Sequence, residues 1–171
     1  MFDFFMPDII CETVYDIDFD SLRRKNIKGL IFDIDNTLVS YKQKTPTNDI
    51  INLMKKLAEA SFTVCFVSNN NKERVDIFNS EFNYFSFPEA RKPFKKSMKN
   101  ALEAMRLANT DIAVIGDQIF TDIIAAKRIK STAILVTPIE PVETFFFGFK
   151  RFLEKPLIRR YYKKLKRQNN L

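Results

Sequence analysis

Four short polar segments of this sequence have residue types and spacings suited to reactions of phosphate esters. Residues 33–37 read Asp-Ile-Asp-Asn-Thr and residues 68–70 read Ser-Asn-Asn. Residues 91–93 read Arg-Lys-Pro, and residues 116–122 begin with Gly-Asp and end with a second Asp. Together they offer carboxylates for a nucleophile and a cation, and neutral and cationic donors for phosphate oxygens.

The carboxylates can act together. Residues i and i+2 of an extended segment point to the same side, so Asp33 and Asp35 can face one ligand. With Asp117 nearby, these carboxylates would repel one another unless a cation lay among them. An all-oxygen site suits Mg²⁺, which takes one or two carboxylates together with waters and phosphate oxygens. We therefore predict Mg²⁺ as the cofactor, held among Asp33, Asp35 and Asp117.

The same residues predict a route for phosphoryl transfer. Beside the cation, Asp33 can be ionised and still attack phosphorus, and Asp35 can supply a proton to the leaving group. A phosphoryl group in transit carries charge on three oxygens, so further donors are needed. Ser68 and Asn69 offer neutral donors, and Lys92 offers a cationic one.

Composition excludes the other common catalytic designs. The chain has no His, which removes Ser-His-Asp and Cys-His catalysis and every His-based metal site. With only 3 Gly, it cannot build a glycine-rich phosphate loop. The two cysteines are far apart, and Cys65 lies in an apolar run, where we expect a buried small side chain in a reduced, cytoplasmic protein.

Five short apolar runs must position these residues. Three of them are nearly continuous in Ile, Val, Leu and Phe, as in strands that helices cover on both faces. The runs are 29–33, 62–68, 84–87, 112–116 and 132–137. Helical spacing occupies the intervals, at 47–60, 71–78, 93–107 and 121–129. This alternation predicts an α/β fold, a doubly wound, Rossmann-like parallel sheet of about five strands. Such a sheet binds ligands beyond the carboxyl ends of its strands, where the polar segments begin.

Each assignment has a structural alternative. Asp117 and Ser68 could cap the helices that follow them, and Asp122 could be a first-turn acid favoured by the helix dipole. Asn69 could be a turn former. The choice of Lys92 rests on the Lys-Pro pair, since several basic residues surround it.

The order and wording of the four motifs resemble a known family. Asp-x-Asp-x-Thr, Ser, Lys and Gly-Asp-x-x-x-x-Asp look like the haloacid dehalogenase (HAD) phosphatase superfamily. The strings IFDIDNTLV, FVSNN, ARKP and GDQIFTD resemble its subfamily IIIA, the YqeG-type phosphatases. A related mitochondrial member dephosphorylates phosphatidylglycerophosphate. The resemblance covers roughly residues 5–140.

The resemblance implies a role for each matching residue. Asp33 would form the aspartyl-phosphate and bind Mg²⁺, and Asp35 would be the general acid and then the base, with its backbone carbonyl on the metal. Thr37 would fix the loop beside the phosphate, and Ser68 would hold a phosphate oxygen. Lys92 would neutralise the phosphoryl charge. Asp117 would be the third protein ligand of Mg²⁺, and Asp122 would orient Lys92 or a metal-bound water.

The chain divides by charge into two parts. Residues 150–171 carry nine basic residues and one acid, a net +8, which leaves −1 for residues 1–149 out of the total of +7. We predict a HAD-like domain over 1–139, with a short N-terminal extension, and a basic, aromatic-rich, helical tail over 140–171.

The tail allows three interpretations. Phe145, Phe149 and Phe152 share one helical face with basic residues off it, a pattern typical of contact with a membrane surface. The same Phe residues could instead cover the domain's own core. Nucleic-acid binding is the third interpretation, although no recognised binding module is present.

The spacing of the motifs bears on the substrate. Between Asp35 and Ser68, and between Ser68 and Lys92, there is room only for a helix, a strand and loops, so we expect no cap domain. An open site suits a phosphate presented on something large, such as a lipid headgroup at a bilayer, a protein or a nucleic-acid end. We therefore expect a phosphomonoester hydrolase, with phosphatidylglycerophosphate as the candidate substrate, in the cytoplasm or at the inner face of the membrane. The alternative is a membrane- or nucleic-acid-binding module that acts through the tail.

Overall fold

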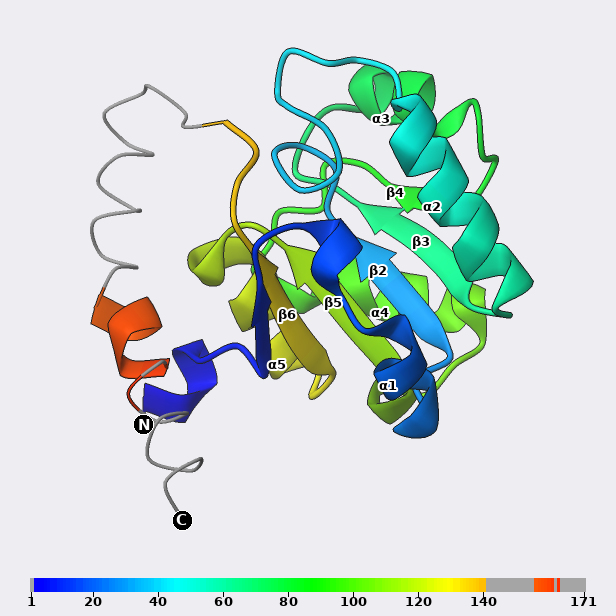
Figure 1. Ribbon diagram of the computed structural model, residues 1–171. Coiled ribbons are helices and arrows are strands. Elements are labelled where there is room, and N and C mark those ends of the chain that lie inside the picture. Colours follow the sequence, from blue (N-terminus) through cyan, green and yellow to red (C-terminus); the bar gives the residue numbers. More distant parts are fainter. Residues whose placement is uncertain (1, 141–155, 162, 164–171) are drawn as a thin grey trace.

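A six-stranded, all-parallel sheet forms the centre of the molecule in the computed structural model (Figure 1). The structure describes residues 2–140, 156–161 and 163. The strands are β1 (Ile9–Cys11), β2 (Gly29–Phe32), β3 (Thr63–Val67), β4 (Phe85–Phe87), β5 (Ile112–Gly116) and β6 (Thr132–Val136). Their order across the sheet is β1-β6-β5-β2-β3-β4. The five predicted strands are confirmed, and the α/β, Rossmann-like fold with them.

The helices follow the strands in alternation. They are α1 (Phe19–Arg24), α2 (Asn48–Glu59), α3 (Lys72–Asn79), α4 (Lys95–Met105) and α5 (Ile124–Arg128). One π-helical turn, η4 (Ile119–Ile123), leads into α5, and short 3-10 turns lie at Phe2–Phe5, Val14–Asp16 and Asn109–Asp111. The helix predicted at 121–129 is therefore partly π-helical. Thr47 caps α2 by accepting from the backbone N–H of Ile50, as its residue type predicts.

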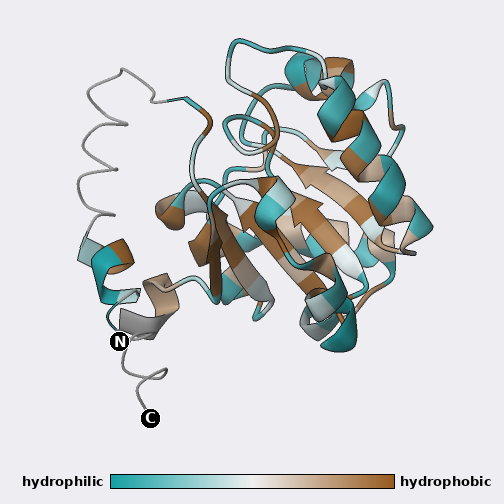
Figure 2. Cartoon of the chain, viewed as in Figure 1, coloured by the Kyte–Doolittle hydropathy of each residue, from teal (hydrophilic) through white to brown (hydrophobic). Residues whose placement is uncertain are grey.

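Both faces of the sheet are buried, which explains the continuous apolar runs. Successive residues of β2 alternate between two cores: Leu30 and Phe32 pack with side chains of α1, α2 and α3, and Ile31 packs with side chains of α4 and α5. These two sets of helices therefore cover opposite faces of the sheet (Figure 1). Figure 2 shows the strands as mostly hydrophobic and the helices as mixed, with hydrophilic residues among the apolar ones.

Strand β1 was not predicted from the sequence. It contains three residues and pairs only with β6, through the register Ile9–Ile134 to Cys11–Val136. A segment this short has too few residues to display a periodicity, and its pairing depends on the position of β6, which is distant in the sequence. Cys65 is buried and free, as expected.

One described segment of the tail contacts the domain. Residues 156–161 are helical, and Leu157 and Ile158 pack against the core on the α4 and α5 side. The Tyr161 hydroxyl donates to the backbone carbonyl of Asp8 at 3.4 Å. Phe145, Phe149 and Phe152 lie outside the described residues, so the predicted boundary at residue 140 and the proposed roles of these rings stay predictions.

The chain reverses its direction of travel across the sheet at β2. From β2 it moves outward through β3 to β4, and then crosses to β5 on the other side of β2 and continues to β6. The carboxyl ends of β2 and β5 therefore flank a topological switch point, which is where open α/β sheets bind ligands. No helix in the described part of the chain is long and apolar enough to cross a membrane.

Candidate active site

The polar residues at the switch point come from three neighbouring strands. Asp33 follows β2, and its backbone N–H donates to the carbonyl of Ile115 in β5 at 2.9 Å. Asp117 follows β5 directly. Ser68 follows β3, and its N–H donates to the carbonyl of Phe87 in β4 at 3.1 Å. The parallel register thus brings together residues that are up to 84 positions apart in the sequence.

Asp33 lies buried between two donors. Its Oδ1 accepts from the Lys92 ammonium at 2.6 Å, and its Oδ2 accepts from the Thr37 hydroxyl at 3.2 Å. Burial raises the pKa of Asp33 to about 7, although the charge of Lys92 acts in the opposite direction. Thr37, expected beside the phosphate, therefore orients the carboxylate of Asp33 in the structure.

Lys92 connects two carboxylates. Its Nζ lies 2.6 Å from Asp33 Oδ1 and 2.7 Å from Asp122 Oδ1, and it also donates to the carbonyl of Val67 at 2.7 Å. Burial alone would lower the pKa of Lys92, but the charges of Asp122 and Asp33 outweigh burial and raise it. The lysine is therefore held as a cation at the point where a phosphoryl group would approach Asp33.

The backbone of Lys92 is held by Asn69. The Asn69 side-chain oxygen accepts from the Lys92 N–H at 2.6 Å, and its amide nitrogen donates to the Lys92 carbonyl at 3.3 Å. Asn69 was predicted as a phosphate donor, and in the structure its amide supports Lys92. The hydroxyl of Ser68 accepts from the N–H of Asn70 at 3.1 Å, and its own hydrogen can still be donated to a phosphate oxygen.

Asp122 projects from the π-helical turn toward Lys92. Its Oδ2 accepts from the N–H of Gln118 and from the hydroxyl of Thr121, both at 3.1 Å, and its Oδ1 faces Lys92. Gly116 makes this approach possible, because a Cβ atom there would lie 2.3 Å from Asp122 Cγ. Asp122 thus has the geometry to orient Lys92, and that role stays a prediction.

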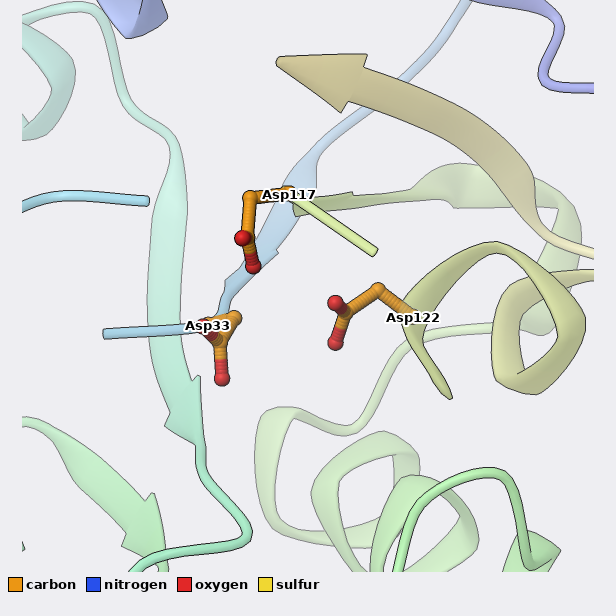
Figure 3. Close-up of side chains that lie close together, drawn as sticks. All are labelled: Asp33, Asp117 and Asp122. Carbon is orange, nitrogen blue, oxygen red and sulfur yellow. The ribbon is translucent and has the colours of Figure 1, made fainter. Parts of the chain in front are cut away.

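Three carboxylates converge at this point. Oxygen atoms of Asp33, Asp117 and Asp122 all lie within 4.8 Å of one another, and Figure 3 shows their side chains turned toward a common region. All three residues are buried. When ionised they carry three negative charges against the single positive charge of Lys92, an imbalance that a divalent cation would offset. Hard carboxylate oxygens of this kind fit Mg²⁺.

The side chain of Asp35 is engaged elsewhere. Its Oδ1 accepts from the Arg74 guanidinium at 2.8 Å, and its Oδ2 accepts from the Asn70 amide at 3.0 Å. From the residue types its carboxylate was expected beside the cation, and the resemblance implied a metal contact through its backbone carbonyl. The Asp35 carboxylate is not among the three that converge, and Asp35 as a metal ligand stays a prediction. Arg74 was not predicted as a site residue. The available signal was a charged residue in α3 next to Val75, a core position.

A cavity of about 210 Å³ lies beside Asp33 and Lys92. Carboxylates, the Lys92 ammonium and neutral polar groups line it. The lining residues are Asp33, Asp35, Asn36, Tyr41, Ser68, Asn69, Asn70, Asn71, Lys92, Gln118, Thr121 and Asp122. Larger hollows of about 680 and 630 Å³ lie over α1 and α2 and beside the loop that follows Asp35. We place the candidate active site in the smaller cavity because its lining contains Asp33, the expected nucleophile, and the buried Lys92.

The fold and the carboxylates at its strand ends define a class of protein, the HAD-like α/β proteins, and no cap domain interrupts the described residues 2–140. The fold is shared with a haloacid dehalogenase-like hydrolase of Streptococcus pneumoniae, 15% identical, with a TM-score of 0.53 over 66% of this chain and 85% of that chain. It is also shared with the cobalt-bound deoxy-D-mannose-octulosonate 8-phosphate phosphatase of Haemophilus influenzae, 15% identical, with a TM-score of 0.53 over 66% and 69%.

Sequence similarity narrows the class to a family. The family described as mitochondrial PGP phosphatase matches residues 2–142. The probable phosphatase YqeG of Bacillus subtilis (strain 168) is 34% identical over 155 residues, which cover 91% of this chain and 90% of that protein. The chain belongs to this family of YqeG-type HAD phosphatases, and it is a phosphatase.

Proposed function

We propose that the protein is a Mg²⁺-dependent phosphomonoester hydrolase that forms an aspartyl-phosphate on Asp33. The observation that carries the proposal is the position of Asp33, 2.6 Å from a buried lysine and within 4.8 Å of two further buried carboxylates. The buried acidic cluster fits Mg²⁺, and the phosphatase of Haemophilus influenzae that shares this fold has been solved in a cobalt-bound form. When bound, the cation would supply positive charge to the phosphate oxygens and keep Asp33 ionised.

The residues of the chain then divide the reaction into two displacements. A carboxylate oxygen of Asp33 attacks phosphorus, the bond from phosphorus to the ester oxygen breaks, and Asp35 gives that oxygen a proton. Lys92 and Ser68 hold the charged phosphoryl oxygens. In the second step, Asp35 accepts a proton from water as the water attacks phosphorus, which releases inorganic phosphate and restores Asp33.

The substrate class follows from how open the site is. Residues 33–92, all of them described, contain α2, β3, α3 and β4 and no inserted cap. An uncovered cavity of about 210 Å³ accommodates a phosphate group and little more, so the rest of the substrate would remain outside. We propose a lipid headgroup phosphate, with phosphatidylglycerophosphate as the first candidate, since the family is described as PGP phosphatase.

The site's surroundings support presentation of this phosphate at an interface. Tyr41 lines the cavity and is 54% exposed, and Phe94, two residues after Lys92, is 66% exposed. Residues 150–171 supply eight net positive charges that would attract an anionic surface. We propose a peripheral membrane contact on these grounds. A pure binding module is not favoured, because the family and the curated relative are phosphatases.

The nucleophile is tested by phosphate release with Mg²⁺ and with a chelator, for the wild type and Asp33→Asn. We expect release that requires Mg²⁺ and falls by at least about 10³-fold in the variant. Acid-quenched wild-type protein should contain a phosphorylated peptide that includes Asp33. Asp20→Asn, a change at an exposed carboxylate, is the matched control and should leave activity unchanged. Retained activity in Asp33→Asn would exclude Asp33 as the nucleophile.

The substrate is tested by comparing phosphatidylglycerophosphate in mixed micelles with water-soluble glycerol 3-phosphate. We expect a higher kcat/KM for the lipid, by about 10²-fold, because the lipid and the micelle surface add contacts around the open cavity. An equal or higher kcat/KM for glycerol 3-phosphate would contradict the proposed substrate class and leave the catalytic assignments intact.

A further inference from the structure

We propose that Arg74 is a positioning residue for Asp35, and that it holds the carboxylate where it can exchange a proton with the leaving group. The inference rests on the proposed function, in which Asp35 acts as the general acid. It adds a residue outside the four motifs, on helix α3.

One guanidinium group connects three parts of the site. An Nη2–H of Arg74 donates to Asp35 Oδ1 at 2.8 Å and another to the carbonyl of Gln43 at 2.9 Å. Nη1 donates to the carbonyl of Lys44 at 2.8 Å. Gln43 and Lys44 belong to the loop between β2 and α2, which also carries Tyr41 to the cavity. Arg74 therefore fixes Asp35 relative to this loop and to α3.

The location of Arg74 is unfavourable for a cation unless it has a partner. It lies in the first turn of α3, after the cap Asn71, where the helix dipole favours negative charge. Its side chain and that of Asp35 are each only 9% exposed, so both charges have lost most of their hydration. Buried ion pairs seldom stabilise a fold more than apolar packing would. The arrangement is better explained by orientation of Asp35 than by stability of α3.

Asp35 is restrained through both oxygens. Oδ1 accepts from Arg74 and Oδ2 accepts from the amide of Asn70, so rotation of the carboxylate would break one contact or both. A carboxylate has about four lone-pair positions, so each oxygen keeps one for a proton or a leaving group. Asp35 and Asn70 line the cavity beside Asp33. Without Arg74, the acid would be held through Asn70 alone.

The test compares two leaving groups, because only a poor one needs a proton from the acid. We expect Arg74→Met to lower kcat/KM for an alkyl phosphate, glycerol 3-phosphate, by about 10²-fold. The value for p-nitrophenyl phosphate, whose leaving group departs as an anion, should fall less than about tenfold. Asp35→Asn should show the same selectivity, and the double variant should lose little more than Asp35→Asn alone. Arg74→Lys, which can reach Asp35 but not all three acceptors, should recover part of the alkyl phosphate activity.

The matched control is Lys72→Met, which removes a positive charge from the same helix at an exposed position paired with Asp76. It should leave both kcat/KM values unchanged. If Arg74→Met does not fold, the test uses Arg74→Lys instead, and the quantity compared is the ratio of its kcat/KM values for glycerol 3-phosphate and p-nitrophenyl phosphate. An equal loss on both substrates, or no loss, would overturn the role of Arg74. Failure of the proposed function is distinguishable: Asp35→Asn would then lack leaving-group selectivity, or Asp33→Asn would stay active, and either result would also overturn this inference.

Discussion

At the scale of single residues, the site concentrates buried charge that a fold by itself would avoid. Asp33, Asp117 and Asp122 place three carboxylates around one ammonium, and Lys92 is shared between two of them. Burial raises the pKa of Asp33 to about 7, which shows that the lysine does not fully offset the cost of ionising this carboxylate. A bound divalent cation would complete the balance of charge.

This environment predicts a pH dependence of stability in the cation-free protein. The ordinary pKa of an Asp carboxyl is 3.8, and the pKa of folded Asp33 is about 7. Between these two pH values Asp33 holds a proton in the folded protein and releases it in the unfolded chain, so the free energy of unfolding falls as the pH rises through this window. The loss is roughly 4 kcal/mol as an upper limit. Asp33→Asn cannot ionise and should unfold at higher urea concentration than the wild type at pH 8 with chelator, and the difference should shrink toward pH 4.

The matched control for this measurement is again the exposed Asp20→Asn, which should follow the wild-type profile. If the wild type is as stable as Asp33→Asn at pH 8 without a cation, then ionised Asp33 is adequately compensated by Lys92. The conclusion that ionising the buried Asp33 carboxyl destabilises the folded protein would then be wrong.

At the scale of elements, the turn between β3 and α3 uses consecutive Asn residues for different purposes. Asn69 holds the backbone of Lys92, Asn70 donates to Asp35, and Asn71 caps α3 by accepting from the N–H of Arg74. The turn thus positions both the cationic residue and the general acid of the proposed mechanism.

Because Asn69 and Asn71 make different contacts, replacing each with Ala should change a different property of the protein. Asn69→Ala should lower kcat by about 10-fold to 10²-fold, because Lys92 loses both of its backbone contacts with the amide, and it should change the melting temperature little. Asn71→Ala should lower the free energy of unfolding by about 1 kcal/mol through loss of the cap, with a smaller fall in kcat than in Asn69→Ala. Thermal unfolding and steady-state kinetics on both variants check this, and equal kinetic effects would contradict it.

The junction of β5 and the π-helical turn makes a second prediction at this scale. A Cβ atom on Gly116 would lie 2.3 and 2.4 Å from Cγ and Cβ of Asp122, so Gly116→Ala must displace Asp122 from Lys92. We expect kcat to fall by about 10²-fold and the free energy of unfolding to fall by about 1–3 kcal/mol.

Gly29→Ala is the matched control for that variant. A Cβ atom on Gly29 would meet the ends of the Leu107 and Met105 side chains, at 2.6 and 2.7 Å, which are far from the site and can move. It should lower stability and leave kcat unchanged. Equal loss of kcat in the two variants would show that Gly116 is needed only for packing.

At the scale of the whole molecule, the sheet order brings the acidic cluster together before any ligand binds. Asp33 and Asp117 follow adjacent strands at the switch point, and α4 and α5 cover the face from which Lys92 and Asp122 approach. The unfolded chain has no such cluster. A cation that binds only the folded state must therefore stabilise the entire domain.

This coupling predicts that Mg²⁺ raises the melting temperature. At a concentration about 100-fold above its Kd, the gain is about 2.7 kcal/mol, or roughly 5–10 °C for a chain of this size. Asp117→Asn should abolish most of the gain, and a sodium salt of equal ionic strength should not reproduce it. Differential scanning calorimetry checks the prediction, and an unchanged response in Asp117→Asn would exclude Asp117 as a ligand.

The sequence by itself determined the strand and helix alternation and the residues at the strand ends. Apolar runs with polar termini at 29–33 and 112–116 predict buried parallel strands, and the position of Asp33 directly after one of them is a local property of the chain. Ser68, Lys92, Asp117 and Asp122 were identified in the same way, by motif order and spacing.

Only the tertiary structure decided which side chains contact one another. Arg74 contacts Asp35, 39 positions away in the sequence, because α3 packs on the sheet. Asn69 contacts Lys92, 23 positions away, because β4 brings the chain back to the edge of the sheet where the strands end. Strand β1 likewise exists only through its pairing with β6. Short-range periodicity reports which residues are buried. The partners of a buried charge depend on how distant elements pack, and no local pattern records that.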